Sequence, residues 1–581
     1  MSKLSIDQKT IEGLFSDKKT DFLIPDYQRP YAWENKECQQ LWEDIFAFAF
    51  PDDDYEKFNN DDEYYLGTIV TFKNESNKKL EVIDGQQRLT TLMLLLRAFY
   101  SKFGNMKDKN SITTRETIGK CLWKGDEFGN LDTDILKIDS QVATDNDKDE
   151  FLSILRDGVA PKEMKSKYAE NYRFFEMKIA EFLNNYPSFF PYLPNRILKN
   201  CILLPIEAES QDTALRIFST LNNRGLSLSD ADIFKSELYK KFSKLNRKDE
   251  FIERWKLLDE KCNKYFKPQY GTPMDELFSR YMYYERAKMN ITKSTTEALR
   301  TFYGRDNFKL LNEETMANLE LLMDFWIDVL EQSEDRFTSE VIKQMFILEY
   351  APNGMWTNFL SVYFMHHKDS NNQLDNEKLH AFLKKIIAFI WTYAITNPGV
   401  NALRTPVYKE MHHILNNKEV TFSDTKFDKK KTTDSLNSYN YLNGRPITKS
   451  MLVWWAMNTV EQAIPDLSVR FEIEHIYARN RNNKENTLKR ASDVELLGNK
   501  SILEQRINIR ASDYRFEDKK KYYLGYTNKR NEKKGGTIVK ELENFAKDSS
   551  RTDFSAIDIQ TRTETILKAF CKYIGEENLF A

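Results

Sequence analysis

The chain has 581 residues, a formal net charge of −3, 41% hydrophobic and 13% aromatic side chains, and five cysteines that form no CxxC pair. This composition excludes a disordered chain, a disulfide framework and a zinc ribbon, and with no signal-peptide pattern it predicts a reduced cytoplasmic protein. No apolar run approaches the about 18 residues that cross a bilayer, so we expect no membrane segment. The length predicts several domains.

The first third of the chain is expected to mix short strands with helices. Period-two and buried-strand patterns predict strands over 21–25, 65–72, 80–83 and 202–206. A helix is expected from Asn35, with Leu41, Trp42 and Ile45 on one face, and a second, strongly apolar helix runs through Leu96 to Phe99.

The strand over 80–83 passes through Asp84 and Gly85 into the second of these helices. Unpaired N–H groups and the helix dipole favour an anion at such a helix start. Gly85 allows a close backbone approach, Arg88 can bind phosphate oxygens, and Asp84 could hold a metal or cap the helix. The alternative is that Asp84 only caps and Arg88 forms a salt bridge. The loop is not a Walker A motif, which needs GxxxxGK[ST].

A second polar cluster follows the strand over 202–206. We expect a helix over 212–221, a turn at Asn222–Gly225, and a capped helix start at Ser229. A structural helix–turn–helix connection explains Gly225 and Ser229. It explains Asn222, Arg224 and Lys235 less well.

Three blocks of this region resemble the signatures of the GmrSD-type N-terminal domain, namely IPDYQRPYAW (24–33), VIDGQQRLTTL (82–92) and residues 218–235. The resemblance implies a ParB/sulfiredoxin-like fold over 1–240 that binds and hydrolyses a nucleoside triphosphate. The resemblance places the nucleotide or phosphate pocket at Gln28, Arg29, Asp84, Gly85, Gln86, Gln87 and Arg88.

The middle of the chain is expected to be an α-helical spacer and linker over 241–446. Residues 105–195 contain two charged, poorly periodic stretches, Lys107–Asn110 and Asp145–Glu150, which predict loops or an insertion. Helical periodicity extends from about 245 to 420, and the polar segment 421–446 is expected to be an exposed linker. The adjacent pairs His366–His367 and His412–His413 are poor metal chelators, because neighbouring helix residues point apart.

The last domain, 447–581, is expected to begin with a helix over 447–463. A strand over 468–474 ends in His475, a short strand near 496–503 follows, and a helix runs through Asn508. His475 is the only histidine after His413, so it is the candidate base for neutral-pH chemistry. Strand alternation puts Glu474 and His475 on opposite faces, so a shared metal-bound phosphate requires the strand to end or bulge there.

The order Glu474–His475, Asn499 and Asn508 resembles the HNH (ββα-metal) nuclease centre, and more specifically the C-terminal domain of the GmrSD family. The resemblance implies that His475 is the general base, that Asn499 orients the histidine or scaffolds the loop, and that Asn508 and Glu474 hold one divalent metal. The chain departs from the pattern at Glu474, where Asp is common, and at Ala478, where Pro is usual. The alternative is a hydrogen-bonded histidine at a strand end, with asparagines that are turn residues.

Basic and aromatic residues alternate beyond this centre, which favours phosphate contact with base packing, although solvated helix faces show the same pattern. The candidate DNA-binding residues are Lys519, Lys520, Lys521, Lys529 and Arg530.

These observations together predict a multidomain α+β protein. We expect an NTP-dependent, modification-sensing DNA endonuclease of phage defence that uses Mg²⁺ or Mn²⁺. Its partners would be DNA, with modified phage DNA foremost, and a nucleoside triphosphate, with no membrane and a possible homo-oligomer. The alternatives are a DNA- or nucleotide-binding regulatory protein with a lapsed nuclease centre, and a nuclease indifferent to nucleotide whose DGQQR pocket contacts DNA phosphate.

Overall fold

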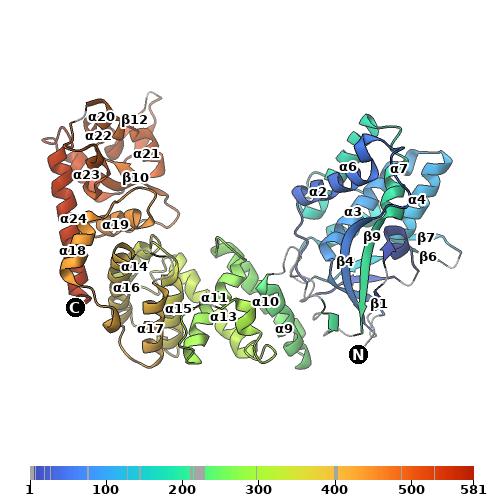
Figure 1. The fold of residues 1–581 in the computed structure, drawn as a ribbon, viewed down its shortest axis with the longest axis horizontal. Helices are drawn as coiled ribbons and strands as arrows, with labels where there is room; N and C mark the ends of the chain where they lie inside the picture. The colour runs from blue at the N-terminus through green and yellow to red at the C-terminus, as the bar shows by residue number, and fades with distance from the viewer. Residues whose placement is uncertain are drawn as a thin grey trace. The chain divides into compact units, whose positions relative to one another are not determined.

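A computed structural model describes most of the chain. The described residues are 5–581 except 7, 19, 27, 75–77, 127, 143–144, 210–212, 215–216, 218–228, 296, 398, 400–402, 486 and 529. They form two compact units, Met1–Leu257 and Leu258–Ala581 (Figure 1). The fold is α+β, as predicted, and the expected domain boundaries at 240 and 446 stay predictions.

The first unit is built on a mixed seven-stranded sheet. Its path runs β1 (Ser5–Ile6), β9 (Cys201–Ala208), β4 (Tyr64–Lys73), β5 (Leu80–Asp84), β3 (Phe22–Ile24) and β8 (Ile138–Ser140), and β2 (Lys9–Thr10) also pairs with β9. The four predicted strands are therefore confirmed as β3, β4, β5 and β9. In Figure 1, β4 and β9 are the long adjacent arrows of this unit.

Helices cover the sheet of the first unit. They are α1 (Ile11–Phe15), α2 (Asn35–Ala49), α3 (Gln86–Lys102), α4 (Lys109–Leu122), α5 (Lys148–Asp157), α6 (Lys167–Asn185), α7 (Tyr192–Asn200) and α9 (Asp230–Lys244). The helix that follows, α10 (Lys248–Tyr265), contains the boundary between the two units. The main core packs one face of the sheet against helices α1 to α7, and α3 is buried along most of its length because it lies at the centre of that core. Tyr239 of α9 packs on a smaller cluster around Val70 and Ile83. Ser229 caps α9 with Asp232, as its sequence predicts.

Within residues 105–195, the two charged stretches predicted as loops or an insertion are loops only in part, because Lys109 already begins α4 and Lys148 already begins α5. This segment contains α4 to α7, β8, and a small antiparallel pair, β6 (Trp123–Gly125) with β7 (Leu131–Leu136). Its helices bury narrow apolar stripes, such as Ile118 and Leu122 of α4, and their remaining faces are polar enough to hide the helical period.

The second unit begins as a bundle of helices, which confirms the predicted helical periodicity. The helices are α11 (Pro273–Lys288), α12 (Leu299–Tyr303), α13 (Glu313–Leu330), α14 (Ser339–Leu348), α15 (Met355–His367), α16 (Asn376–Thr396), α17 (Arg404–Leu415) and α18 (Lys429–Ser438). One described helix, α16, is long and apolar enough to cross a membrane, and most of it is buried inside the unit. The predicted exposed linker over 421–446 is wrong in part, because α18 and the buried Leu436 and Tyr441 lie within it.

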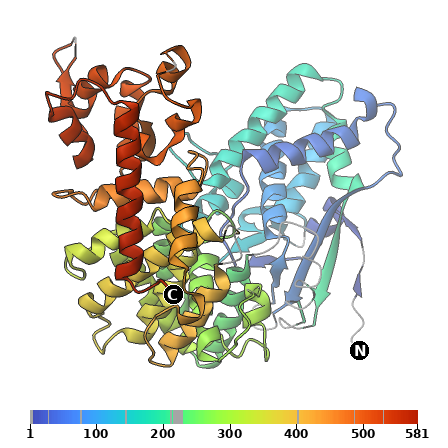
Figure 2. The same ribbon diagram turned by 60° about the vertical axis from the view of Figure 1, so that its left-hand side comes forward.

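The end of the chain adds a small mixed α and β region to this bundle. Its elements are α19 (Pro446–Met457), β10 (Phe471–His475), α20 (Arg479–Glu485), β11 (Lys500–Glu504), α21 (Gln505–Ala511), α22 (Phe516–Leu524), β12 (Gly525–Thr527), β13 (Lys533–Gly535), α23 (Lys540–Lys547) and α24 (Ala556–Glu576). β10 and β11 pair antiparallel, and α21 packs against both. Figure 2 shows α24 as the long red helix that joins this region to the bundle, where it contacts α16 and α18.

Candidate functional site

Three glutamines of the amino-terminal signatures hold two of these motifs together. Gln87 accepts a hydrogen bond from the backbone N–H of Ala32 at 2.7 Å and donates to the carbonyl of Pro30 at 3.1 Å. Gln86 donates to the carbonyl of Arg29 at 3.0 Å, and Gln28 donates to two carbonyls of β5. The amide groups of Gln86 and Gln87 are buried and engaged by backbone, so they position the loop rather than face a ligand.

Charged side chains lie where β5 meets α3. Gly85 adopts φ +87°, and a Cβ there would lie 3.0 Å from the carbonyl oxygen of Thr68. Arg88 donates to that same carbonyl at 2.9 Å, and its guanidinium lies against Gly67. Burial raises the pKa of Asp84, while the charges of Arg88 and Arg29 oppose the rise. Asp84, Arg88 and Arg29 therefore remain the groups able to meet a phosphate or its metal.

The third signature block lies largely outside the described residues, including Asn222 and Arg224. Its last member, Lys235, is buried, and its Nζ donates to the carbonyl of Gln28 at 3.3 Å. The block thus reaches the loop that carries Arg29.

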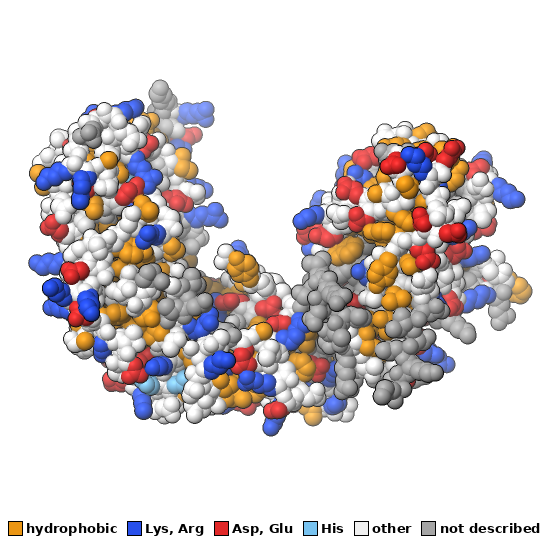
Figure 3. Space-filling model, in the orientation of Figure 1, with side chains coloured by type: hydrophobic (Ala, Val, Ile, Leu, Met, Phe, Trp, Pro, Cys, Tyr) orange, Lys and Arg blue, Asp and Glu red, His pale blue; other side chains and the backbone are white. Residues whose placement is uncertain are grey.

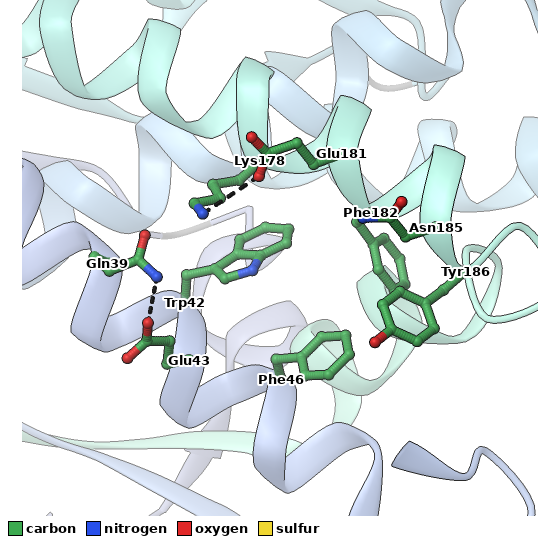
Figure 4. Close-up of a pocket in the computed structure, with 9 residues that line it drawn as sticks. All are labelled: Gln39, Trp42, Glu43, Phe46, Lys178, Glu181, Phe182, Asn185 and Tyr186. Carbon is green, nitrogen blue, oxygen red and sulfur yellow. Dashed lines mark hydrogen bonds and ion pairs between the residues drawn. The ribbon is translucent and has the colours of Figure 1, made fainter.

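A surface groove of about 260 Å³ opens between α2 and α6 of the same unit. Trp42 and Phe46 line it from α2, and Phe182 and Tyr186 line it from α6 (Figure 4). None of the residues predicted to bind nucleotide lines this groove, so it is separate from the signature cluster.

His475 ends β10, where it is only 8% exposed. Its Nε2 lies 3.6 Å from Oε2 of Glu495 and has no hydrogen-bond partner among the described residues. Burial, with the positive charges of Arg479 and Lys500, lowers the pKa of His475 to about 4. The imidazole is therefore neutral at pH 7, which is the form that accepts a proton or binds a metal.

Glu495 links the charged groups around His475, although the sequence pattern did not single it out. Its carboxylate accepts from Lys500 at 2.6 Å and pairs with Arg479 at 2.7 Å. Lys500 is also the cross-strand neighbour of His475. Arg479, Glu495 and Lys500 meet only because the chain between β10 and β11 folds back on the strand pair.

Glu474 is not near these groups. Regular pairing runs through Glu474 and His475 without a bulge, so their side chains leave the strand on opposite faces. The carboxylate of Glu474 is buried and accepts hydrogen bonds from Lys519 at 2.7 Å and Tyr523 at 2.6 Å. Burial raises the pKa of Glu474, and both partners oppose the rise. No bulge brings Glu474 to the side of His475, and Lys519 already neutralises the charge of this carboxylate.

Asn499 is fully buried in the turn before β11. Its Oδ1 accepts from the N–H of Tyr477 at 2.7 Å, and its Nδ2 donates to the carbonyls of Tyr477 and Val494. These bonds fix the backbone that follows His475. Asn508 lies on α21, which packs on the strand pair, and its half-buried amide has no hydrogen bond to another described residue.

The last helix also holds this turn. Arg562 of α24 donates to the carbonyls of Gly498 at 2.9 Å and Lys500 at 2.6 Å, and it pairs with the buried Glu541. Thr563 accepts from the N–H of Gly498. A Cβ on Gly498 would lie 2.1 Å from the carbonyl oxygen of Ile559, so only glycine fits this approach.

The predicted DNA-binding residues divide into two groups. Lys519 and Lys520 are buried, and Lys519 donates to Glu474 and to the carbonyl of His475, so neither side chain presents a free ammonium group at the surface. Lys521 and Arg530 are exposed, and Lys529 lies outside the described residues. Figure 3 shows basic and acidic side chains interspersed over the visible face of the second unit, which is not a uniform basic groove.

No group of three His, Cys, Asp or Glu side chains able to hold a metal occurs within the described part of the chain. The adjacent histidine pairs bind protein groups instead: His366 contacts Asn417 at 2.9 Å, and His412 contacts the carbonyl of Ile291 at 3.1 Å.

Two family models match the chain. Residues 11–239 match the GmrSD restriction endonuclease N-terminal domain, and residues 408–569 match the GmrSD restriction endonucleases C-terminal domain. No curated protein matches the chain. The two matches cover more than half of the sequence, in the order that the signatures predict. The chain belongs to the GmrSD restriction endonuclease family, and it is therefore a DNA endonuclease of phage defence.

Proposed function

We propose that the protein is an NTP-dependent, modification-sensing DNA endonuclease in which His475 is the general base. The observation that carries this proposal is the neutral imidazole of His475, with an unbonded Nε2, at the end of a strand pair on which the helix of Asn508 packs. This arrangement lies inside the region that matches the C-terminal endonuclease domain.

The residues around His475 suit phosphodiester hydrolysis. The imidazole takes a proton from water as the water oxygen attacks phosphorus, and the bond from phosphorus to the leaving sugar oxygen breaks. The carboxylate of Glu495 stabilises the imidazolium that forms, because it lies 3.6 Å from Nε2. Arg479, which is about half-exposed, supplies positive charge for the phosphate.

We propose Mg²⁺ or Mn²⁺ as the cofactor, because the resemblance to the family's nuclease centre implies one divalent metal. Asn508 is free to bind a metal, whereas Glu474 does not fit this role, because Lys519 and Tyr523 occupy its carboxylate. A bound divalent ion would neutralise phosphate charge.

The amino-terminal unit is proposed to bind the nucleoside triphosphate at the start of α3. Asp84, Arg88 and Arg29 are the charged groups there, and the first turn of α3 offers backbone N–H groups. The Arg88→Ala variant should lose nucleotide binding and nucleotide-dependent cleavage.

The central test is cleavage by the purified full chain of phage DNAs with glucosylated, methylated, phosphorothioated and plain bases, with and without ATP, GTP or UTP. We expect cutting of one modified class in Mg²⁺ or Mn²⁺ and none in EDTA. His475→Ala should abolish cutting, while the matched His366→Ala should not. Retained cleavage in His475→Ala would remove the proposed base.

One observation favours a second candidate, a DNA- or nucleotide-binding regulator with a lapsed nuclease centre. The carboxylate that the resemblance assigns to the metal is neutralised by Lys519. If the centre has lapsed, the protein should bind DNA but cleave none of the substrates. Calorimetry should then detect no specific Mn²⁺ binding, whereas an active centre should bind Mn²⁺ and lose that binding in Asn508→Ala.

A further inference from the structure

Three tyrosines, here called the tyrosine row, form a connected series of rings on the surface of the second unit. Tyr514 follows α21, Tyr522 lies on α22 and Tyr526 lies on β12, and Figure 1 shows these elements together at one end of the unit. The rings of Tyr514 and Tyr522 are stacked, with centroids 5.9 Å apart and planes 12° apart. The rings of Tyr522 and Tyr526 meet edge to face at 5.2 Å. Both are favourable ring arrangements, so the row has a defined geometry.

Tyr514 is the most accessible ring of the row. It is 48% exposed, whereas Tyr522 and Tyr526 are half-buried. The backbone N–H of Tyr514 donates to the carbonyl of Ala511, and only the short segment 512–515 joins α21 to α22. Because Tyr522 and this turn already hold the ring in place, a ligand that stacks on it loses little free energy to ordering the side chain.

The tyrosine row lies beside the residues proposed for DNA cleavage. The helix of Tyr522, α22, also carries Lys519, whose Nζ donates to the carbonyl of His475 at 2.6 Å. The helix before Tyr514, α21, carries Asn508 and packs against β10 and β11. The two helices next to the row therefore both contact the strand pair that contains His475.

Positive charge is concentrated in the same segment. Residues 505–535 contain ten lysines and arginines and four aspartates and glutamates, in a chain whose formal net charge is −3. The Nζ of the exposed Lys521 lies 4.9 Å from the centroid of the Tyr522 ring. Arg506 and Arg510 lie one turn apart on α21. Basic groups next to aromatic rings complement a polyanion whose base faces are accessible.

We propose that this region holds single-stranded DNA, with an unpaired base stacked on Tyr514 and neighbouring phosphates at Lys521 and Arg510. Proteins bind single strands in this way, because every base has an aromatic face and the backbone follows basic groups. A paired base in a duplex is already stacked on its neighbours, so its face is closed to a side chain. The inference deepens the proposed function and rests on it: the nuclease centre acts on DNA that is unpaired near the cut.

The test is fluorescence anisotropy with the full chain in EDTA, so that no probe is cut. The probes are a labelled oligo(dT) of about 12 nucleotides, within the site sizes of single-strand binders, and a strand of equal length with abasic sites in place of the bases. We expect the oligo(dT) to bind about fivefold to a hundredfold more tightly than the abasic strand. Tyr514→Leu should remove most of this difference without changing the affinity for the abasic strand, and Tyr514→Trp should keep the difference.

Two controls separate base stacking from phosphate contact and from a general effect of losing a tyrosine. Lys521→Ala should weaken the binding of both probes by the same factor, because its side chain contacts phosphate. Tyr270→Leu removes a tyrosine of the same unit that is 84% exposed, and it should change neither affinity. If Tyr514→Leu does not fold, as thermal unfolding would show, Tyr522→Leu is the second variant. It removes the ring behind Tyr514 and should also reduce the difference between the probes.

The alternative occupant of this surface is a second copy of the chain, because Ile509 and Leu524 of the same two helices are also exposed. The proposal is overturned if the wild type binds both probes equally, or if Tyr514→Leu keeps the difference between them. A lower molar mass of Tyr514→Leu in light scattering, with that difference intact, would assign the row to an interface between copies. His475→Ala should bind both probes as the wild type does, so the result does not depend on whether the protein cuts DNA.

Discussion

Lys519→Ala should destabilise the region around β10 rather than simply weaken DNA binding. The Nζ of Lys519 lies 2.7 Å from Glu474 and 2.6 Å from the carbonyl oxygen of His475, and the two side chains are 1% and 5% exposed. Removing one partner of a buried pair leaves an uncompensated charge, at a cost of about 3–5 kcal/mol. At about 1.4 kcal/mol per factor of ten, amide exchange in β10 and α22 should accelerate by about a hundredfold to a few thousandfold.

Hydrogen-exchange mass spectrometry of the full chain measures this effect peptide by peptide. The matched control is Lys521→Ala, an exposed neighbour on α22, which should leave exchange unchanged while lowering DNA affinity. The double variant Glu474→Gln/Lys519→Met, which removes both charges, should recover most of the lost protection. Unchanged exchange in Lys519→Ala, together with a weaker salt dependence of DNA binding, would refute the buried-pair argument.

Three further predictions follow from the described geometry. Because the pKa of His475 falls from an unfolded value of about 6.5 to about 4, the unfolded chain takes up this proton first as the pH drops. The free energy of unfolding of the second unit should therefore decline between pH 6.5 and 4, by about 3 kcal/mol more in the wild type than in His475→Gln. Urea unfolding measures this, and the same pH dependence of the unfolding free energy in both proteins would contradict the prediction. Gln87→Ala should lower the unfolding free energy of the first unit by about 1–3 kcal/mol, because the N–H of Ala32 and the carbonyl of Pro30 lose a partner, and an unchanged thermal midpoint would count against this role. Gly85→Ala should cost about 1–2 kcal/mol, since φ is +87° and Thr68 is close, whereas Gly104→Ala, with no atom near its Cβ, should cost little in the same thermal assay.

The strands and helices with clear periodicity were predictable from local sequence. α2 begins at Asn35 as expected, and β5 passes into α3 at Gly85. The missed helices share a physical cause. α18 buries only Thr432 and Leu436, so its apolar stripe is too narrow to stand out in a polar segment.

The candidate site was predictable in part, for a related reason. The motif around His475 is local, but the expected placement of Glu474 beside the same metal required a bulge or strand end, and regular pairing keeps Glu474 on the other face. The contacts that decide the chemistry are not local: Lys519 reaches Glu474 from 45 residues away, and Glu495 reaches His475 across a turn. The glutamines of the DGQQR motif likewise proved to hold backbone, because their amides are buried against the 29–33 loop.

The hydrogen bonds from Arg562 make the turn before β11 depend on a distant part of the chain. That turn carries Asn499, which fixes the backbone after His475, yet its carbonyls are secured by a side chain from the last helix. During synthesis the strand pair leaves the ribosome well before α24 does. The turn is therefore secured only after α24 has folded against it, so the surroundings of His475 are completed by a segment that is made later than the strand pair.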